Sequence, residues 1–96
     1  NMKNLKTKQM VTVKKFSAVW CGPCRALTPV MNEIKGNYSN VKFEEYDIDE
    51  YSDITEEYGV RSVPTVIIVK DGIEVNRFTG LSSKMAYVNA INESLK

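Results

Sequence analysis

The sequence predicts a single α/β domain with a central mixed four-stranded sheet flanked by helices. Its 96 residues, 43% of them hydrophobic, suffice for one modest core and leave little for a second domain. Segments with the periodicity of strands alternate with segments of helical periodicity, and the connections between them are short. The expected order of elements is βαβαββα, with residues 11–96 forming the domain. Residues 1–10 form an extension with room for a short edge strand at Leu5.

The first three elements are a strand over 11–18, a helix ending at Gly36 and a second strand over 41–48. The helix opens at the segment Cys-Gly-Pro-Cys, and its apolar residues recur at helical spacing: Leu27, Val30, Met31 and Ile34. A helix of this length between two strands favours a right-handed crossover, so the second strand should run parallel to the first.

The remaining elements are a short helix over 52–58, two strands over 65–69 and 73–78, and a last helix. The segment Lys70-Asp71-Gly72 between the two strands is typical of a hairpin turn. The last helix takes Ser82 as its candidate N-cap and has an apolar face made of Met85, Val88, Ile91 and Leu95. Helices are expected on both faces of the sheet.

The charge balance favours neither nucleic acid nor a membrane as a partner. Lysine and arginine nearly cancel aspartate and glutamate, for a net charge of +1, and no basic stripe accompanies the aromatic residues. No stretch approaches the roughly 20 apolar residues of a membrane span. The apolar run that follows the N-terminal lysines ends at Lys14, too soon for a signal-peptide core. A cytoplasmic monomer is the expectation.

Two cysteines and no histidine exclude most metal and cofactor sites. A structural zinc site normally takes four cysteine or histidine ligands, which one such chain cannot provide. Covalent haem attachment needs a histidine directly after the second cysteine, where Arg25 stands. We therefore expect no metal and no bound cofactor.

The spacing of Cys21 and Cys24 is typical of a redox pair. Side chains three residues apart in the first turn of a helix share a face, so the two sulfurs can form a disulfide with little backbone movement. Unpaired amides and the positive end of the helix dipole stabilise a thiolate there. Cys21, nearer the helix end, is expected to be the more exposed residue and the nucleophile, and Cys24 to resolve the mixed disulfide.

A purely structural disulfide is the alternative for this pair. The chain-entropy model gives a disulfide that closes so short a loop little stabilising value, and structural disulfides are rare in the cytosol. The redox role is therefore favoured. Trp20 adds a wide apolar contact beside the nucleophile, Pro23 suits the start of a helix, and Gly22 lets another chain approach closely.

Two segments resemble the motifs of the thioredoxin family. Residues 16–25, Phe-Ser-Ala-Val-Trp-Cys-Gly-Pro-Cys-Arg, resemble its active-site segment, and residues 60–65, Val-Arg-Ser-Val-Pro-Thr, resemble its cis-proline loop. The resemblance covers about residues 11–96. It implies a thioredoxin-like fold, a cis Val63–Pro64 bond facing the cysteines, substrate backbone pairing at Val63, and a substrate groove beside Gly80.

The charges beneath the active site depart from the family pattern. At Lys15 the family usually has a buried acid that helps to deprotonate the resolving cysteine, and at Glu45 it usually has a lysine close to that acid. The alternation of side chains along a strand supports a pair of charges at these positions. Val11, Val13 and Lys15 share one face of the first strand, and Val41, Phe43 and Glu45 share one face of the second. We expect Lys15 and Glu45 to pair below the disulfide; two solvated strand ends are the alternative. A protonated Lys15 would favour the Cys24 thiolate electrostatically, whereas a neutral Lys15 would accept its proton, and the sequence leaves both roles open.

The resemblance implies an enzyme that reduces protein disulfides and is recycled by a flavin-containing, NADPH-dependent thioredoxin reductase. Its roles would be electron transport and cell redox homeostasis, with the Cys21–Cys24 disulfide as the only redox group. A disulfide oxidase or isomerase is one alternative, although Gly-Pro between the cysteines resembles the reducing members. A binding module or accessory subunit that uses the same scaffold is another, and the intact cysteines argue against it.

Overall fold

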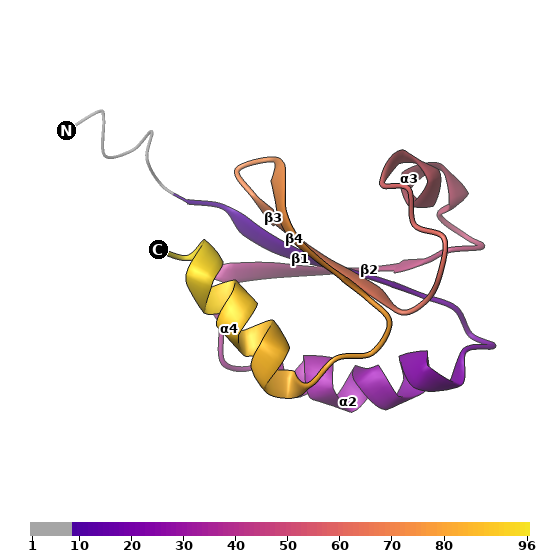
Figure 1. Ribbon diagram of the computed structural model, residues 1–96, viewed down its shortest axis with the longest axis horizontal. Coiled ribbons are helices and arrows are strands. Elements are labelled where there is room, and N and C mark those ends of the chain that lie inside the picture. Colours follow the sequence, from indigo (N-terminus) through magenta and orange to yellow (C-terminus); the bar gives the residue numbers. More distant parts are fainter. Residues whose placement is uncertain (1–8) are drawn as a thin grey trace.

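The computed structural model describes residues 9–96 and contains the expected elements in the expected order (Figure 1). They are β1 (Val11–Ser17), α2 (Gly22–Lys35), β2 (Val41–Asp47), α3 (Ser52–Glu57), β3 (Thr65–Lys70), β4 (Ile73–Thr79) and α4 (Lys84–Ser94). The expected edge strand at Leu5 lies outside the described residues. Over residues 9–96, no helix is both long and apolar enough to cross a membrane.

The four strands form one mixed sheet in the order β2-β1-β3-β4. The pairing of β1 with β2 is parallel, as the intervening helix predicts, whereas β1 with β3 and β3 with β4 are antiparallel. The hairpin between β3 and β4 turns at Asp71 and Gly72, whose φ angles of 52° and 85° lie in the left-handed region. Two positive φ angles in a two-residue loop match the twist of the strands, which explains the Asp-Gly sequence.

Helices cover both faces of the sheet, as predicted. In Figure 1, α2 and α4 lie below the sheet and α3 lies above it. The larger apolar cluster joins the sheet to α2 and α4 and includes Val13, Leu27 and Ile91. The smaller cluster, centred on Phe16 and Ile67, packs toward α3. The central strand β3 is buried on both faces, since five of its six residues are buried.

The start of α4 differs from the prediction by one residue. Ser83, not Ser82, is the N-cap, and its Oγ accepts the Ala86 N–H at 3.1 Å. Ser82 instead donates its backbone N–H to the Tyr87 hydroxyl at 2.9 Å. Two adjacent serines are equally good N-cap residues by type, so the sequence alone does not choose between them. In the structure, the hydrogen bond from Ser82 to Tyr87 leaves Ser83 as the N-cap. The expected place of Met85 in the apolar face is wrong, because Met85 is 60% exposed and the buried face passes through Tyr87 and Ile91.

Candidate active site

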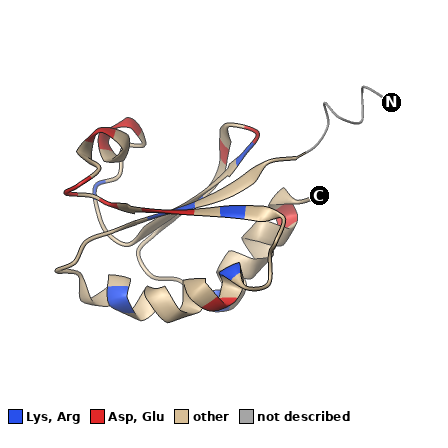
Figure 2. Ribbon diagram, turned by 180° about the vertical axis from the view of Figure 1, so that it is seen from behind, with Lys and Arg blue, Asp and Glu red and all other residues tan. Residues whose placement is uncertain are grey.

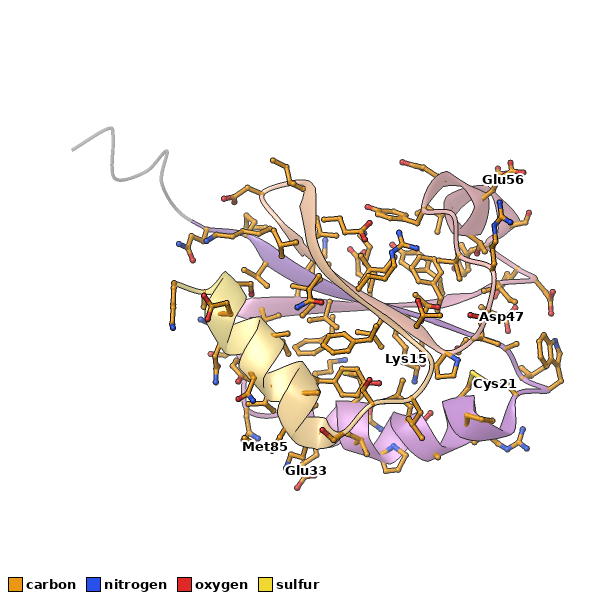
Figure 3. The ribbon with its side chains drawn as sticks, in the orientation of Figure 1. Lys15, Cys21, Glu33, Asp47, Glu56 and Met85 are labelled. Carbon is orange, nitrogen blue, oxygen red and sulfur yellow. A yellow bond between two sulfur atoms is a disulfide. The ribbon has the colours of Figure 1, made fainter. Side chains whose placement is uncertain are left out.

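Cys21 and Cys24 lie where β1 leads into α2. The two residues are joined by a disulfide, and their Cα atoms are 5.3 Å apart, within the usual range for such a bond. Cys21 is the N-cap of α2, and Cys24 lies in its first turn. Figure 3 shows Cys21 at this end of the helix, close to the carboxyl end of β2, which Asp47 marks.

The N-terminus of α2 provides the electrostatic setting of Cys21. Its Sγ accepts the backbone N–H of Cys24 at 3.1 Å and so occupies the position of a capping oxygen. No acidic residue lies in the first turn of the helix. A thiolate formed at Cys21 on reduction would therefore take up an amide hydrogen bond and the positive end of the helix dipole.

Cys21 is the more exposed of the two cysteines, as expected, but only by a small margin. Cys21 is 5% exposed and Cys24 is 3% exposed, so both are buried. They pack with Ala18, and Val63 lies against this small cluster. The carbonyl oxygen of Val63 is 3.8 Å from the Sγ of Cys21, whereas Trp20, Gly22 and Pro23 beside the cysteines are exposed. Cys21 therefore lies between these exposed residues and the backbone of Val63.

The loop before β3 closes the site on its other side. The Val63–Pro64 bond is cis, as the resemblance implies. Pro64 is buried, and its carbonyl accepts the N–H of Gly80 at 2.8 Å. Gly80 has a φ of 88°, a conformation that favours glycine. The structure thus brings Val63 against Cys21 and holds Gly80 against Pro64 in the same loop region.

Asp49 holds the indole of Trp20, an interaction that no sequence pattern indicated. Trp20 is 64% exposed, and its Nε1 donates to Oδ2 of Asp49 at 3.2 Å. Asp49 belongs to the turn after β2, in which Oδ1 of Asp47 accepts the N–H groups of Asp49 and Glu50. The expected parallel pairing of β1 and β2 was the one indirect indication, because parallel strands end on the same side of the sheet and the residues that follow them lie close together.

Lys15 and Glu45 form an ion pair beneath the active site. They are register partners in β1 and β2, and Nζ of Lys15 lies 2.6 Å from Oε2 of Glu45. The Lys15 side chain is 6% exposed and the Glu45 side chain 63% exposed, so the pair is half-buried. Lys15 also donates to the Thr28 hydroxyl at 3.3 Å. Figure 3 shows Lys15 on the side of the sheet that α2 covers.

An open groove of about 400 Å³ lies beside Cys24. Its lining includes Cys24, Thr28 and the charged residues Arg25, Glu45, Asp47 and Glu50. The carboxylates belong to the acidic stretch that follows the chain from β2 into α3 (Figure 2). Over residues 9–96, no three histidine, cysteine, aspartate or glutamate side chains gather as a metal site would require.

Known proteins share both the sequence and the fold. The family model for thioredoxin matches residues 2–93. The thioredoxin of Chlamydia caviae is 44% identical over 78 residues, which cover 81% of this chain and 76% of the relative. The thioredoxin of Rickettsia felis is 42% identical over 81 residues, covering 83% and 77%.

Two crystal structures give the same result. A thioredoxin of Nicotiana alata superimposes with a TM-score of 0.84 at 36% identity, covering 97% of this chain and 82% of that one. The thioredoxin of Fasciola hepatica gives 0.83 at 30% identity, covering 97% and 89%. The chain therefore belongs to the thioredoxin family, and with its Cys21–Cys24 pair it is a thiol-disulfide oxidoreductase that reduces protein disulfides.

Proposed function

We propose that Cys21 is the nucleophile and Cys24 the resolving thiol in the reduction of disulfides in other proteins. The observation that carries this assignment is the position of the Cys21 sulfur as N-cap of α2, where it accepts the Cys24 N–H. Only a thiolate attacks a disulfide, and this is where the helix favours one most.

In the first step, the Cys21 thiolate attacks one sulfur of the substrate disulfide. A new S–S bond joins Cys21 to the substrate, the substrate S–S bond breaks, and one substrate sulfur leaves as a thiolate. In the second step, the Cys24 thiolate attacks the Cys21 sulfur. The protein disulfide forms, the mixed disulfide breaks, and the second substrate sulfur leaves. The substrate gains two electrons, and its two thiolates take up protons from solvent.

The substrate segment would bind over Cys21, between the exposed residues beside it and the backbone of Val63. Exposed Trp20, held by Asp49, offers apolar contact area, and Gly22 and Pro23 leave the rim without bulky side chains. On the opposite wall, the backbone around Val63 would pair with an extended substrate. Pro64 and Gly80 support that wall through their hydrogen bond.

Lys15 and Glu45 would assist Cys24. The Lys15 ammonium, paired with Glu45 at 2.6 Å, lies under the helical turn that carries Cys24. A positive charge there favours the Cys24 thiolate and therefore the resolving step. Glu45 compensates the charge of a side chain that is otherwise buried.

The oxidised protein would be returned to the dithiol form by an NADPH-dependent thioredoxin reductase, a flavoprotein. This supply of electrons supports roles in electron transport and cell redox homeostasis. The proposed location is the cytoplasm, and the proposed state is a monomer without a bound cofactor. The family match supports the reductase as electron donor.

Reduction of insulin disulfides by dithiothreitol, with and without the protein, tests the proposal. We expect the protein to accelerate precipitation of the reduced insulin chains and Cys21→Ser to abolish the acceleration. An unaltered rate with the wild-type protein would contradict the proposal and favour a scaffold that only binds partners. Reactivation of a scrambled protein without net reduction would favour the isomerase.

A further inference from the structure

The hydroxyl of Thr28 lies between Lys15 and Cys24. Thr28 Oγ1 accepts from the Lys15 ammonium at 3.3 Å and donates to the carbonyl oxygen of Cys24 at 3.2 Å. Thr28 follows Cys24 by four residues, so it lies one turn further along α2, and it lines the groove beside Cys24. The hydroxyl therefore connects the buried cation of β1 with the helical turn of the resolving cysteine.

The two hydrogen bonds of Thr28 fix the direction of its hydroxyl. A threonine inside a helix can donate its proton to the carbonyl four residues earlier. With the proton committed to the Cys24 carbonyl, the lone pairs of Oγ1 remain for the Lys15 ammonium. Lys15 thus has oxygen partners on two elements, Glu45 on β2 and Thr28 on α2.

The second partner matters because Glu45 and Thr28 are both exposed residues, so neither alone holds the ammonium firmly. The Glu45 side chain is 63% exposed, and a lysine side chain is long and flexible. With Glu45 as its only partner, the ammonium would have no hydrogen bond to α2. The Thr28 hydroxyl holds it against the helix.

The position of the Lys15 ammonium matters because the charged residues that line the groove beside Cys24 are mainly carboxylates. Glu45, Asp47 and Glu50 line the groove with Cys24, and Arg25 is the cation among them. The Arg25 guanidinium donates to the Val19 carbonyl at 2.9 Å, on the outer side of the loop. Carboxylates near a thiol disfavour its thiolate, so the Cys24 thiolate depends on a cation held close to its own turn.

We propose that Thr28 is a positioning residue, which holds the Lys15 ammonium against α2 so that its charge assists Cys24 in resolving the mixed disulfide. The proposal rests on the proposed function of Lys15. It also predicts which part of Thr28 matters, namely the hydroxyl and not the side-chain shape.

The test measures how fast Cys24 reacts with iodoacetamide as a function of pH, with Cys21→Ser as the common background. Thr28→Val keeps the shape and has nearly the same helix propensity but lacks the hydroxyl, whereas Thr28→Ser keeps it. We expect Thr28→Val to move the midpoint of the profile upward by about 0.5 to 1 pH unit and Thr28→Ser to leave it in place. Lys15→Met should move it upward at least as far.

The double variant Thr28→Val/Lys15→Met separates action through Lys15 from a direct effect on the helix. If Thr28 acts through Lys15, the double variant has the profile of Lys15→Met. An equal shift from Thr28→Val with and without Lys15, or no shift at all, would overturn the proposal. Equal unfolding midpoints for Thr28→Val and Thr28→Ser would show that folding is not the cause.

Insulin reduction by the same variants with Cys21 intact distinguishes a failure of the proposed role of Thr28 from a failure of the proposed function. A wild-type protein that reduces insulin, together with an unaltered Cys24 profile in Thr28→Val, contradicts only the role of Thr28. A wild-type protein that does not reduce insulin contradicts the proposed function itself.

Discussion

Lys15 and Glu45 are direct register partners in the parallel pair β1–β2, and the preceding residues, Lys14 and Glu44, are partners as well. Because side chains alternate along a strand, the two ion pairs lie on opposite faces of the sheet. Lys15 reaches Thr28 of α2, whereas Lys14 lies 5.5 Å from the ring centre of Tyr46 in the cluster beneath α3. A shift of register by one residue would move each lysine to the wrong face, so the two pairs specify the pairing of these strands.

Replacing the resolving cysteine should trap the substrate. In Cys24→Ser, the Cys21 thiolate still attacks, but nothing displaces the substrate from the mixed disulfide. Nonreducing electrophoresis after mixing with oxidised protein substrates should show covalent adducts that disappear on addition of dithiothreitol. Cys21→Ser is the control and should form few adducts. Adducts on Cys21→Ser and none on Cys24→Ser would reverse the assigned roles.

Removing the partner of Lys15 should destabilise the fold. Glu45→Gln leaves a nearly buried ammonium without its compensating charge, at an expected cost of about 1–2 kcal/mol, moderated by the exposure of Glu45. Lys15→Met/Glu45→Leu removes both charges and should recover much of that loss. Denaturant unfolding of both single variants and the double variant measures the coupling. Strictly additive effects would show that the two charges do not interact.

The same variants should separate the two chemical steps. Lys15→Met should slow the displacement of substrate by Cys24 more than the first attack by Cys21, since the cation lies beneath the turn of Cys24. Rapid acid quenching followed by the intact mass distinguishes the reduced, mixed-disulfide and oxidised proteins. A larger accumulation of mixed disulfide in Lys15→Met is the expected result. Equal slowing of both steps would contradict this role.

Periodicity in the sequence was enough to predict the strands, the helices and their order. The pairing of Lys15 with Glu45 was also predictable, because both follow two apolar residues at a spacing of two on neighbouring strands. The burial of Cys21 was not predictable from local patterns. Cys21 packs against Val63, which lies 42 residues later in the loop before β3. The contacts of Thr28 with Lys15 and of Asp49 with Trp20 were missed for the same reason, because each joins residues from different segments of the chain.

The N-cap of α4 offers a matched pair of variants on adjacent serines. Ser83→Ala removes the oxygen that accepts the Ala86 N–H and should cost about 1 kcal/mol of unfolding free energy. Ser82→Ala should cost less, because Ser82 contributes its backbone N–H to the Tyr87 hydroxyl and alanine retains that group. Denaturant unfolding of both variants checks the order. A larger loss for Ser82→Ala would place the start of the helix one residue earlier.

The ion pair on the α3 face should make stability depend on pH in the acid range. The pKa of the Glu44 carboxyl is lowered from 4.5 to about 2, chiefly because the Lys14 ammonium donates to it at 2.6 Å, although burial acts in the opposite direction. The Tyr46 hydroxyl, which donates to Glu44 at 2.7 Å, contributes to the same lowering. A carboxyl with a depressed pKa stabilises the fold above its unfolded value, and the contribution is lost as the pH falls through the folded value.

We therefore expect Glu44→Gln to be less stable than the wild type at pH 7 by about 1–2 kcal/mol, and the difference to shrink as the pH falls from 4.5 toward 2. Lys14 does not titrate in this window, because its pKa is raised from 10.5. Burial, the largest single effect, lowers it, but the hydrogen bond and the charge of Glu44, together with Tyr46 and Tyr58, outweigh burial. Glu56, exposed on α3 (Figure 3), provides the control, and Glu56→Gln should track the wild type throughout. Urea unfolding at a series of pH values gives all three curves. A deficit in Glu44→Gln that stays constant down to pH 2 would show that the ionisation of Glu44 is not what stabilises this face of the sheet.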